Sequence, residues 1–345
     1  MKALQVTAWQ RPPEVVEVAV PEPGPGEVVV RVRAAGACHS DLHILEFPEG
    51  MSSWKLPFTL GHEIAGSVAA LGAGVSEWRE GDDVVVYGPW GCGRCRQCRL
   101  GMENYCERAA DIDGAGAGLG RDGGMADYVL VPSARLLVAL PAGLDPVAAA
   151  PLTDAALTPY HAVKRALPSL VPGSTAVVIG VGGLGHMAIQ LLRALSPATI
   201  VAVDANDEKL GLAAEVGADH LVHAGDDAAA QVRTHAGGQG AELVLDHVGA
   251  DDTLALAAAV AGVGARITVI GIALGTFPFS FISLPYECTI GSTYWGSAVE
   301  LMEVLALGAQ GRIAAHVERF GLDGALDAYD RMRAGTLRGR AVIVP

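Results

Sequence analysis

The 345-residue chain has little positive charge, few cysteines and few aromatic residues, and these shortages limit what it can be. Lysine and arginine total 24 against 38 acidic residues, which gives a formal net charge of −14. Binding to a nucleic-acid backbone relies on clustered basic residues, so this charge argues against a nucleic-acid partner. Six cysteines, four of them close together, do not resemble an extracellular disulfide framework.

The sequence also lacks an uninterrupted membrane-spanning segment. Its first residues, MKALQVTAWQRPPEV, contain no apolar run of the signal-peptide kind, which favours a cytoplasmic protein. Two stretches without charged residues, 166–192 and 267–286, are long enough to span a bilayer. Both contain prolines and several glycines, so we expect buried strands joined by glycine turns and no membrane partner.

The length and the 51% hydrophobic content predict about two globular domains. Before residue 153, short apolar runs alternate with turn residues, as in VVEVAV (15–20), EVVVRVRAAG (27–36) and GDDVVVYG (81–88), which indicates a β-rich domain. After residue 153, strands are expected at 175–179, 199–204, 220–223, 242–246, 265–270 and 289–293, and helices near 184–195, 207–216, 226–236 and 251–262. This alternation predicts an α/β fold with a doubly wound parallel sheet. Residues 297–311 are expected to form a helix, and the final LRGRAVIVP a strand that returns to the first domain.

Four cysteines in the run CGRCRQCRLGMENYC carry the most specific signal: Cys92, Cys95, Cys98 and Cys106. Two-residue gaps let a tight loop point successive sulfurs at one centre, and closed sites of four thiolates are typical of structural zinc. Free or disulfide-bonded cysteines are the alternative. The neighbouring residues Arg94, Arg96 and Arg99 also leave open a zinc-ribbon-like nucleic-acid module, although we interpret them as a solvated loop face.

A glycine motif, GxGxxG, follows the expected strand at 175–179 and opens an apolar helix. Gly180 permits a tight turn, Gly182 lets a pyrophosphate approach the backbone, and Gly185 packs the helix against the strand, with Gly183 and Leu184 inside the same turn. The pattern predicts a dinucleotide site.

Asp204 ends the next strand, 19 residues after Gly185. A carboxylate at that point can accept hydrogen bonds from the adenine ribose and would repel the 2′-phosphate of NADP, so NAD is the expected cofactor. A solvent-facing aspartate is the alternative. Lys209 is a further candidate for covering the ribose, with an exposed helix lysine equally compatible.

Cys38, in CHSDLH, and His62, in GHE, are candidate zinc ligands in the first domain. Each alone would more often be a core or surface residue. Asp154, in PLTDAALTPYH at the domain junction, would complete a three-ligand site with an open fourth position, as catalytic zinc requires.

Taken together, the GHE segment, the four-cysteine lobe, the glycine turn with its aspartate and the terminal RGRAVIVP resemble zinc-dependent alcohol dehydrogenases of the medium-chain dehydrogenase/reductase family. PLTDA, GPWGCG (88–93) and TYWG (293–296) are most similar to bacterial NAD-dependent secondary alcohol dehydrogenases. The resemblance implies a GroES-like catalytic domain over 1–152 and 297–345, with the structural-zinc lobe at 92–106. It implies an NAD-binding Rossmann domain over 153–296.

The resemblance also implies roles for individual residues. Cys38, His62 and Asp154 would hold the catalytic zinc, with Asp154 standing where many relatives carry a cysteine. The remaining implied residues are Glu63 beside the metal, Asp41 orienting His62, Ser40 and His43 as a proton relay, His39 near the pyrophosphate, Gly249 and Gly271 under the cofactor, and Arg340 on a phosphate. His43 as a core or rim histidine, and Arg340 as a surface charge, stay open as alternatives.

The implied reaction is reversible hydride transfer between an alcohol and NAD. Trp54, Leu119, Tyr294 and Trp295 are candidates for an apolar substrate pocket, although aromatic residues are more often core, and Tyr294 and Trp295 also suit a subunit contact. The pocket would favour medium-sized secondary alcohols. The alternatives are a polyol or amino-alcohol dehydrogenase and a non-catalytic protein that binds zinc and a dinucleotide. An apolar edge strand at 289–293 favours a homodimer or homotetramer.

Overall fold

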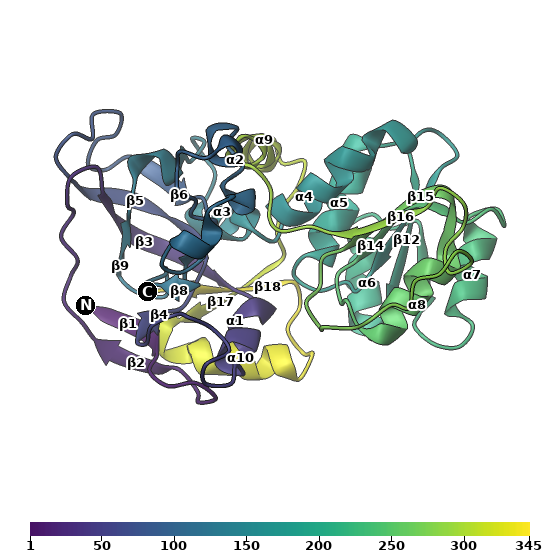
Figure 1. Cartoon of the computed structure of the whole chain (residues 1–345), viewed down its shortest axis with the longest axis horizontal. Coiled ribbons are helices and arrows are strands. Elements are labelled where there is room, and N and C mark those ends of the chain that lie inside the picture. Colours follow the sequence, from purple (N-terminus) through teal and green to yellow (C-terminus); the bar gives the residue numbers. More distant parts are fainter. The chain divides into compact units, whose positions relative to one another are not determined.

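The computed structural model describes residues 1–345, which fold into two compact units (Figure 1). The first unit contains Met1–Asp154 and Gly296–Pro345, and the second contains Ala155–Trp295. These limits fall within two residues of the expected boundaries. They differ in one respect that matters for the site, because Asp154 belongs to the first unit and not to the second.

The first unit is built mainly of short strands. Its strands are β1 (Lys2–Val6), β2 (Glu14–Glu17), β3 (Val28–Ala37), β4 (Phe58–Thr59), β5 (Glu63–Leu71), β6 (Asp83–Val86), β7 (Gly116–Ala117), β8 (Gly120–Arg121), β9 (Tyr128–Val131), β10 (Leu137–Ala139), β17 (Val317–Gly321) and β18 (Arg340–Val344). Its helices are α1 (His39–Leu45), α2 (Arg96–Arg99), α3 (Pro146–Ala149), α9 (Ala298–Ala309) and α10 (Ala325–Arg333). The expected helix at 297–311 is therefore α9.

The main sheet of this unit has the order β10-β6-β5-β3-β18-β17, with β9 also paired to β3. The C-terminal strand β18 pairs antiparallel with β3, as expected for a tail that returns to the first domain. Because β3 is antiparallel to both β5 and β18, the end of β3 lies beside the starts of the other two strands. The pairs Gly36–Glu63 and Ala37–Ala341 thus bring three distant parts of the chain to one end of the sheet.

The second unit has a six-stranded parallel sheet. Its strands are β11 (Thr175–Ile179), β12 (Thr199–Asp204), β13 (His220–His223), β14 (Ala241–Asp246), β15 (Ala261–Val269) and β16 (Thr289–Ser292), in the order β13-β12-β11-β14-β15-β16. The helices are α4 (Leu157–Ala166), α5 (Gly185–Leu195), α6 (Asp207–Glu215), α7 (Ala228–His235) and α8 (Asp251–Val260). All six predicted strands and all four predicted helices are present, with ends shifted by a few residues.

Both faces of this sheet are covered. In β11, Ala176 and Val178 belong to an apolar cluster with residues of α4 and α5, whereas Val177 and Ile179 belong to another with residues of α7 and α8. A parallel strand buried on both faces needs a continuous apolar sequence, which is why TAVVI shows no alternation. The helices lie on both sides of the sheet in Figure 1.

None of the helices combines the length and hydropathy needed to cross a membrane. The charge-poor stretch 166–192 contains β11 and most of α5, and the stretch 267–286 contains the end of β15 and the loop that follows it. The first stretch contains the buried strand and glycine turn that the sequence predicted. The prediction is wrong for most of the second stretch, because residues 271–286 form a largely exposed loop after β15.

Candidate functional site

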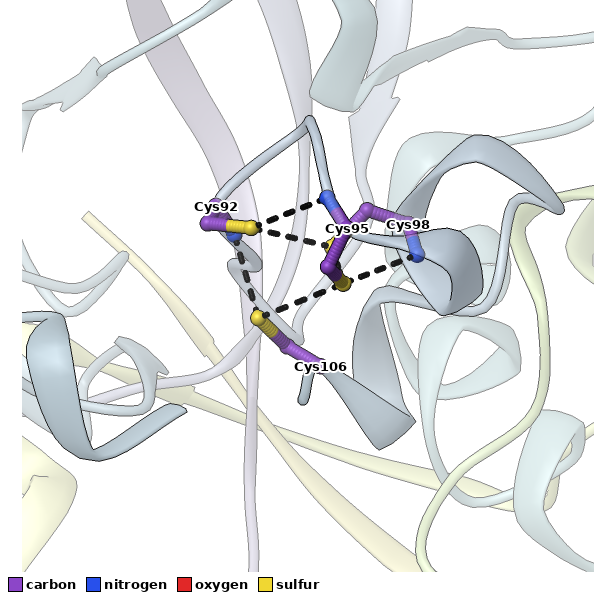
Figure 2. A group of neighbouring side chains, drawn as sticks. All are labelled: Cys92, Cys95, Cys98 and Cys106. Atoms are coloured by element: carbon purple, nitrogen blue, oxygen red, sulfur yellow. Dashed lines mark hydrogen bonds between the residues drawn. The ribbon is translucent and has the colours of Figure 1, made fainter. Parts of the chain in front are cut away.

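The four sulfurs of Cys92, Cys95, Cys98 and Cys106 converge in the lobe around α2 (Figure 2). Neighbouring sulfurs are separated by 3.4 Å (Cys95–Cys98), 3.9 Å (Cys92–Cys98) and 4.0 Å (Cys95–Cys106). Four sulfurs bound at about 2.3 Å around one zinc lie about 3.8 Å apart in a tetrahedron. None of the six cysteines of the chain forms a disulfide, so the disulfide alternative is wrong.

Backbone N–H groups surround these sulfurs. Cys95 N–H donates to Cys92 Sγ at 3.3 Å, Cys92 N–H to Cys106 Sγ at 3.3 Å, and Arg108 N–H to Cys106 Sγ at 3.4 Å. A hydrogen bond from the backbone of Arg94 contributes most to lowering the pKa of Cys92, to about 6, whereas burial raises the pKa of Cys98. Four thiolates packed this closely need a cation, and the donor set fits zinc.

The second cluster consists of Cys38, His62 and Asp154, whose ligand atoms all lie within 4.8 Å of one another. His62 Nε2 is 3.5 Å from Asp154 Oδ2, and Cys38 Sγ is 3.9 Å from the same oxygen. Ligands bound at about 2.0–2.3 Å around a tetrahedral zinc are about 3.3–3.8 Å apart. Cys38 follows β3 and His62 precedes β5, so the pairing of these strands brings the two residues together. Asp154 follows a short 3-10 turn at 150–153 that packs against the same strands.

The carboxylate of Asp41 lies behind His62. Asp41 is fully buried, and its Oδ1 is 3.3 Å from His62 Nδ1, which leaves the other ring nitrogen facing Cys38 and Asp154. Burial would lower the pKa of His62, but the charge of Asp41 and the hydrogen bond to Asp154 outweigh burial and raise it well above 6.5. A sulfur and a carboxylate oxygen thus lie against the same ring nitrogen, and this donor set fits zinc.

Glu63 and Arg340 form a buried ion pair next to this cluster. Arg340 donates to both oxygens of Glu63, through Nε at 2.9 Å and through a terminal nitrogen at 2.6 Å. The same terminal nitrogen is 3.6 Å from Asp154 Oδ2. Arg340 is only 3% exposed, so its interpretation as a surface charge is wrong; the proposed contact with a cofactor phosphate stays a prediction. Burial raises the pKa of Glu63 to about 7, against the effect of Arg340.

Helix α1 carries the residues predicted for proton transfer. Cys38 is its N-cap, and the backbone N–H of Cys38 donates to Asp41 Oδ2 at 2.9 Å, which fixes the start of the helix. Ser40 Oγ is 3.5 Å from Cys38 Sγ, so this hydroxyl lies at the edge of the cluster. His43 is half-buried in the last turn, and His39 is exposed in the first. Their roles in proton transfer and in pyrophosphate binding stay predictions.

In the second unit, the glycine turn joins β11 to α5 as the motif predicted. Gly180 has φ +85°, which favours glycine, and a side chain at Gly185 would clash with the carbonyl of Gly180. Gly182 has open space where a Cβ would point. β11 lies between β12 and β14, so this turn borders the point where strand order reverses, at which open α/β sheets bind ligands.

Asp204, at the end of β12, holds this turn. Its Oδ2 accepts a hydrogen bond from Val181 N–H at 2.7 Å, and its Oδ1 accepts one from Asn206 N–H at 2.9 Å. Lys209 follows in the first turn of α6, half-buried. The contacts of Asp204 and Lys209 with a ribose stay predictions.

Gly249 and Gly271 lie in the turns that follow β14 and β15. These two turns pack against each other, because a side chain at Gly271 would clash with Val248 and one at Gly249 would clash with Gly271. This close packing explains why both positions are glycine. Their contact with the cofactor stays a prediction.

The four candidate pocket residues divide between the units. In the first unit, half-buried Trp54 packs edge-on to Phe58 with ring centroids 6.0 Å apart, and Leu119 is buried. In the second, Tyr294 is 40% exposed and Trp295 is buried against it, with centroids 5.1 Å apart. Their joint pocket stays a prediction.

Family models and known relatives agree with this architecture. Residues 24–142 match the alcohol dehydrogenase GroES-like domain, and residues 183–310 match the zinc-binding dehydrogenase domain. An NAD-dependent alcohol dehydrogenase from Sulfurisphaera tokodaii is 35% identical, with all of both chains aligned. The chain belongs to the zinc-dependent alcohol dehydrogenase family.

Two further relatives are informative. The crystal structure of the alcohol dehydrogenase from Aeropyrum pernix covers all of both chains with a TM-score of 0.92 and 35% identity. A D-arabinose 1-dehydrogenase (NADP(+)) from Saccharolobus solfataricus is 34% identical over 100% of this chain and 97% of its own. The predicted family and the fold class, a GroES-like domain with a Rossmann domain, are confirmed.

The sequence predictions missed two features of this alcohol dehydrogenase site. The first is that Arg340 pairs with Glu63, two residues 277 positions apart. The second is Tyr329 in α10, whose hydroxyl donates to Asp41 at 3.0 Å. No local pattern marks either contact, because both depend on the return of the C-terminal segment to the first unit.

Proposed function

We propose that the chain is an NAD-dependent zinc alcohol dehydrogenase that uses Cys38, His62 and Asp154 as its catalytic metal site. One observation carries the proposal: three ligand atoms from three separate parts of the chain lie within 4.8 Å of one another. Three protein ligands with a fourth position left for water or substrate is the arrangement of catalytic zinc. The four-cysteine cluster is the closed arrangement of structural zinc, so we expect two zincs per chain.

Zinc would supply Lewis acidity toward an alcohol or carbonyl oxygen, and NAD would accept or return the hydride. Residues of the chain would orient a metal ligand, transfer the proton and bind the cofactor. Asp41 holds His62 so that Nε2 faces the metal position. Ser40, at the edge of the cluster, would take the proton of the alcohol and pass it toward His43 at the other end of α1. Asp204 would bind the adenine ribose and favour NAD over NADP.

We further propose a medium-sized, apolar, secondary alcohol as substrate. The apolar side chains of Trp54 and Leu119, both in the first unit, support this choice, because a pocket walled by such groups offers little to pair with sugar hydroxyls. A polyol, sugar or amino alcohol is the second candidate, and the relative that acts on D-arabinose gives it specific support.

The test measures NADH formation from 2-alkanols, polyols and amino alcohols, with zinc counted per chain. We compare the wild type with Asp154→Ala, which removes one ligand, and with Asp154→Cys, which replaces it by a thiolate. Asp113→Ala is the matched control, because that aspartate is 58% exposed in the same unit. We expect two zincs and activity on 2-alkanols in the wild type and the control.

Asp154→Ala should lose one zinc together with activity, and Asp154→Cys should keep both zincs. Activity restricted to polyols would overturn the proposed substrate while leaving the metal site intact. One zinc per wild-type chain, with NAD bound and no turnover, would overturn the enzymatic proposal in favour of a binding protein.

We also propose a homo-oligomer assembled through the free edge of the second unit. Strand β16 ends the sheet, and most of its residues are exposed. The preceding loop exposes large apolar side chains, including Leu274 (79%), Phe281 (82%) and Ile282 (87%). Such an edge favours pairing with a second copy. Light scattering should give a dimer or tetramer for the wild type and a smaller species for Ile282→Glu; a monomeric wild type would contradict the proposal.

A further inference from the structure

One oxygen of the Asp41 carboxylate, Oδ2, is held by two donors from outside the metal site. Oδ1 faces His62 Nδ1 at 3.3 Å, while Oδ2 accepts one hydrogen bond from the backbone N–H of Cys38 and another from the hydroxyl of Tyr329. All four residues are buried, and Asp41 is 0% exposed. A carboxylate removed from water depends on such donors, because each one that is missing leaves an oxygen without compensation for lost hydration.

Tyr329 comes from the opposite end of the chain. It lies in α10, 288 residues from Asp41, and its side chain is 1% exposed. Its hydroxyl is 3.0 Å from Asp41 Oδ2 and 3.2 Å from Met125 Sδ. Burial, followed by the charge of Asp41, raises the pKa of Tyr329 well above its ordinary value. The phenol therefore keeps its proton and acts as a permanent donor to Asp41.

We propose that Tyr329 is a positioning residue for the catalytic metal, acting through Asp41 on His62. The inference rests on the proposed Cys38, His62 and Asp154 site. The hydroxyl fixes Oδ2, so that Oδ1 stays directed at Nδ1 of His62, and it withdraws charge from the carboxylate. The fixed direction of Oδ1 keeps the ring plane in place and leaves Nε2 facing Cys38 and Asp154.

Outer partners of metal ligands typically change metal affinity by about 10- to 100-fold when they are removed. Tyr329 contacts Asp41 and not the proposed ligand His62, so we expect a change in metal affinity at the lower end of this range. Tyr329→Phe removes only the hydroxyl, and the ring continues to fill its place in the core. Release of the catalytic zinc to a chromophoric chelator should become about tenfold faster.

The protein carries two controls for this measurement. The four-cysteine site is distant in sequence from α10, and its zinc should be released at the wild-type rate in Tyr329→Phe. Tyr87→Phe is the matched variant, because Tyr87 is also 1% exposed and its hydroxyl donates to the backbone of Gly296 at 2.6 Å, in the same unit. It should leave the release of the catalytic zinc unchanged.

A double-variant comparison separates positioning from general loosening. If Tyr329 acts through Asp41, Tyr329→Phe should add nothing to the faster release already caused by Asp41→Asn. In the cobalt-substituted protein, Tyr329→Phe should shift the visible absorption of the site, and Tyr87→Phe should not.

Unchanged zinc release in Tyr329→Phe would overturn the inference and leave the proposed site standing. Equal acceleration at both zinc sites, or full additivity with Asp41→Asn, would also overturn it, because both indicate a general structural effect. A wild-type chain that holds only the four-cysteine zinc would overturn the proposed site itself, and the inference with it.

Discussion

His247, which follows β14 in the second unit, should lower the folding stability of this unit as the pH falls. Both ring nitrogens of His247 are buried and have no hydrogen-bond partner, although the residue as a whole keeps some exposed surface. Burial, with a smaller contribution from the charge of His186, lowers the pKa of His247 to about 3. The folded protein therefore keeps this ring neutral at pH values where the unfolded chain binds a proton.

The direction and size of the effect follow from proton linkage. The unfolded ring is protonated below about pH 6.5 and the folded ring only below about pH 3, so between these values the unfolded state binds more protons. Stability is thus lost as the pH falls through this window. From pH 7 to pH 5 the loss from His247 alone is about 2 kcal/mol. His247→Phe removes this loss, and removing two unsatisfied nitrogens should add about 1–3 kcal/mol at pH 7.

The assay is urea unfolding of wild type and His247→Phe at pH 7 and pH 5, with hydrogen exchange of β14 as a local measure of the second unit. Zinc release at low pH affects both proteins, so the difference between them isolates His247. His223→Gln is the control, because the side chain of His223 is 57% exposed in the same unit. An identical pH dependence in wild type and His247→Phe would refute the reasoning, because it would mean that His247 finds a partner or water in solution.

Three further outcomes are expected. Arg340→Met should lower the free energy of unfolding by about 3–5 kcal/mol, because it leaves Glu63 buried without its partner. The double variant Arg340→Met with Glu63→Gln should recover most of this stability. Additive losses of stability in the double variant would contradict this account. Asp204→Ser should raise the Kd for NADH about tenfold or more without raising the Kd for NADPH; both are measured by the fluorescence of the bound nucleotide. Cys106→Ser should lower the zinc content from two to one and reduce the thermal midpoint, and retention of both zincs would argue against the four-thiolate site.

Local patterns made much of the fold predictable. The second unit follows the alternation of apolar strands and helices almost residue by residue, because strands buried on both faces require continuous apolar runs such as TAVVI. The four-cysteine cluster was equally predictable, since its ligands lie within one short loop and their spacing alone limits the geometry. The glycine turn was also predictable, because a positive φ at Gly180 and close packing at Gly185 favour glycine at both positions.

The sequence by itself determined these local features and supplied Cys38, His62 and Asp154 as candidates. Only the tertiary structure decided that these three meet, that Asp154 belongs with the first unit, and that Arg340 is buried on Glu63. The same holds for Tyr329 behind Asp41. The physical reason is that β3 pairs antiparallel with both β5 and the C-terminal strand β18, which lies about 300 residues further along the chain. Such long-range pairing depends on the packing of the whole unit, which no short window of sequence contains.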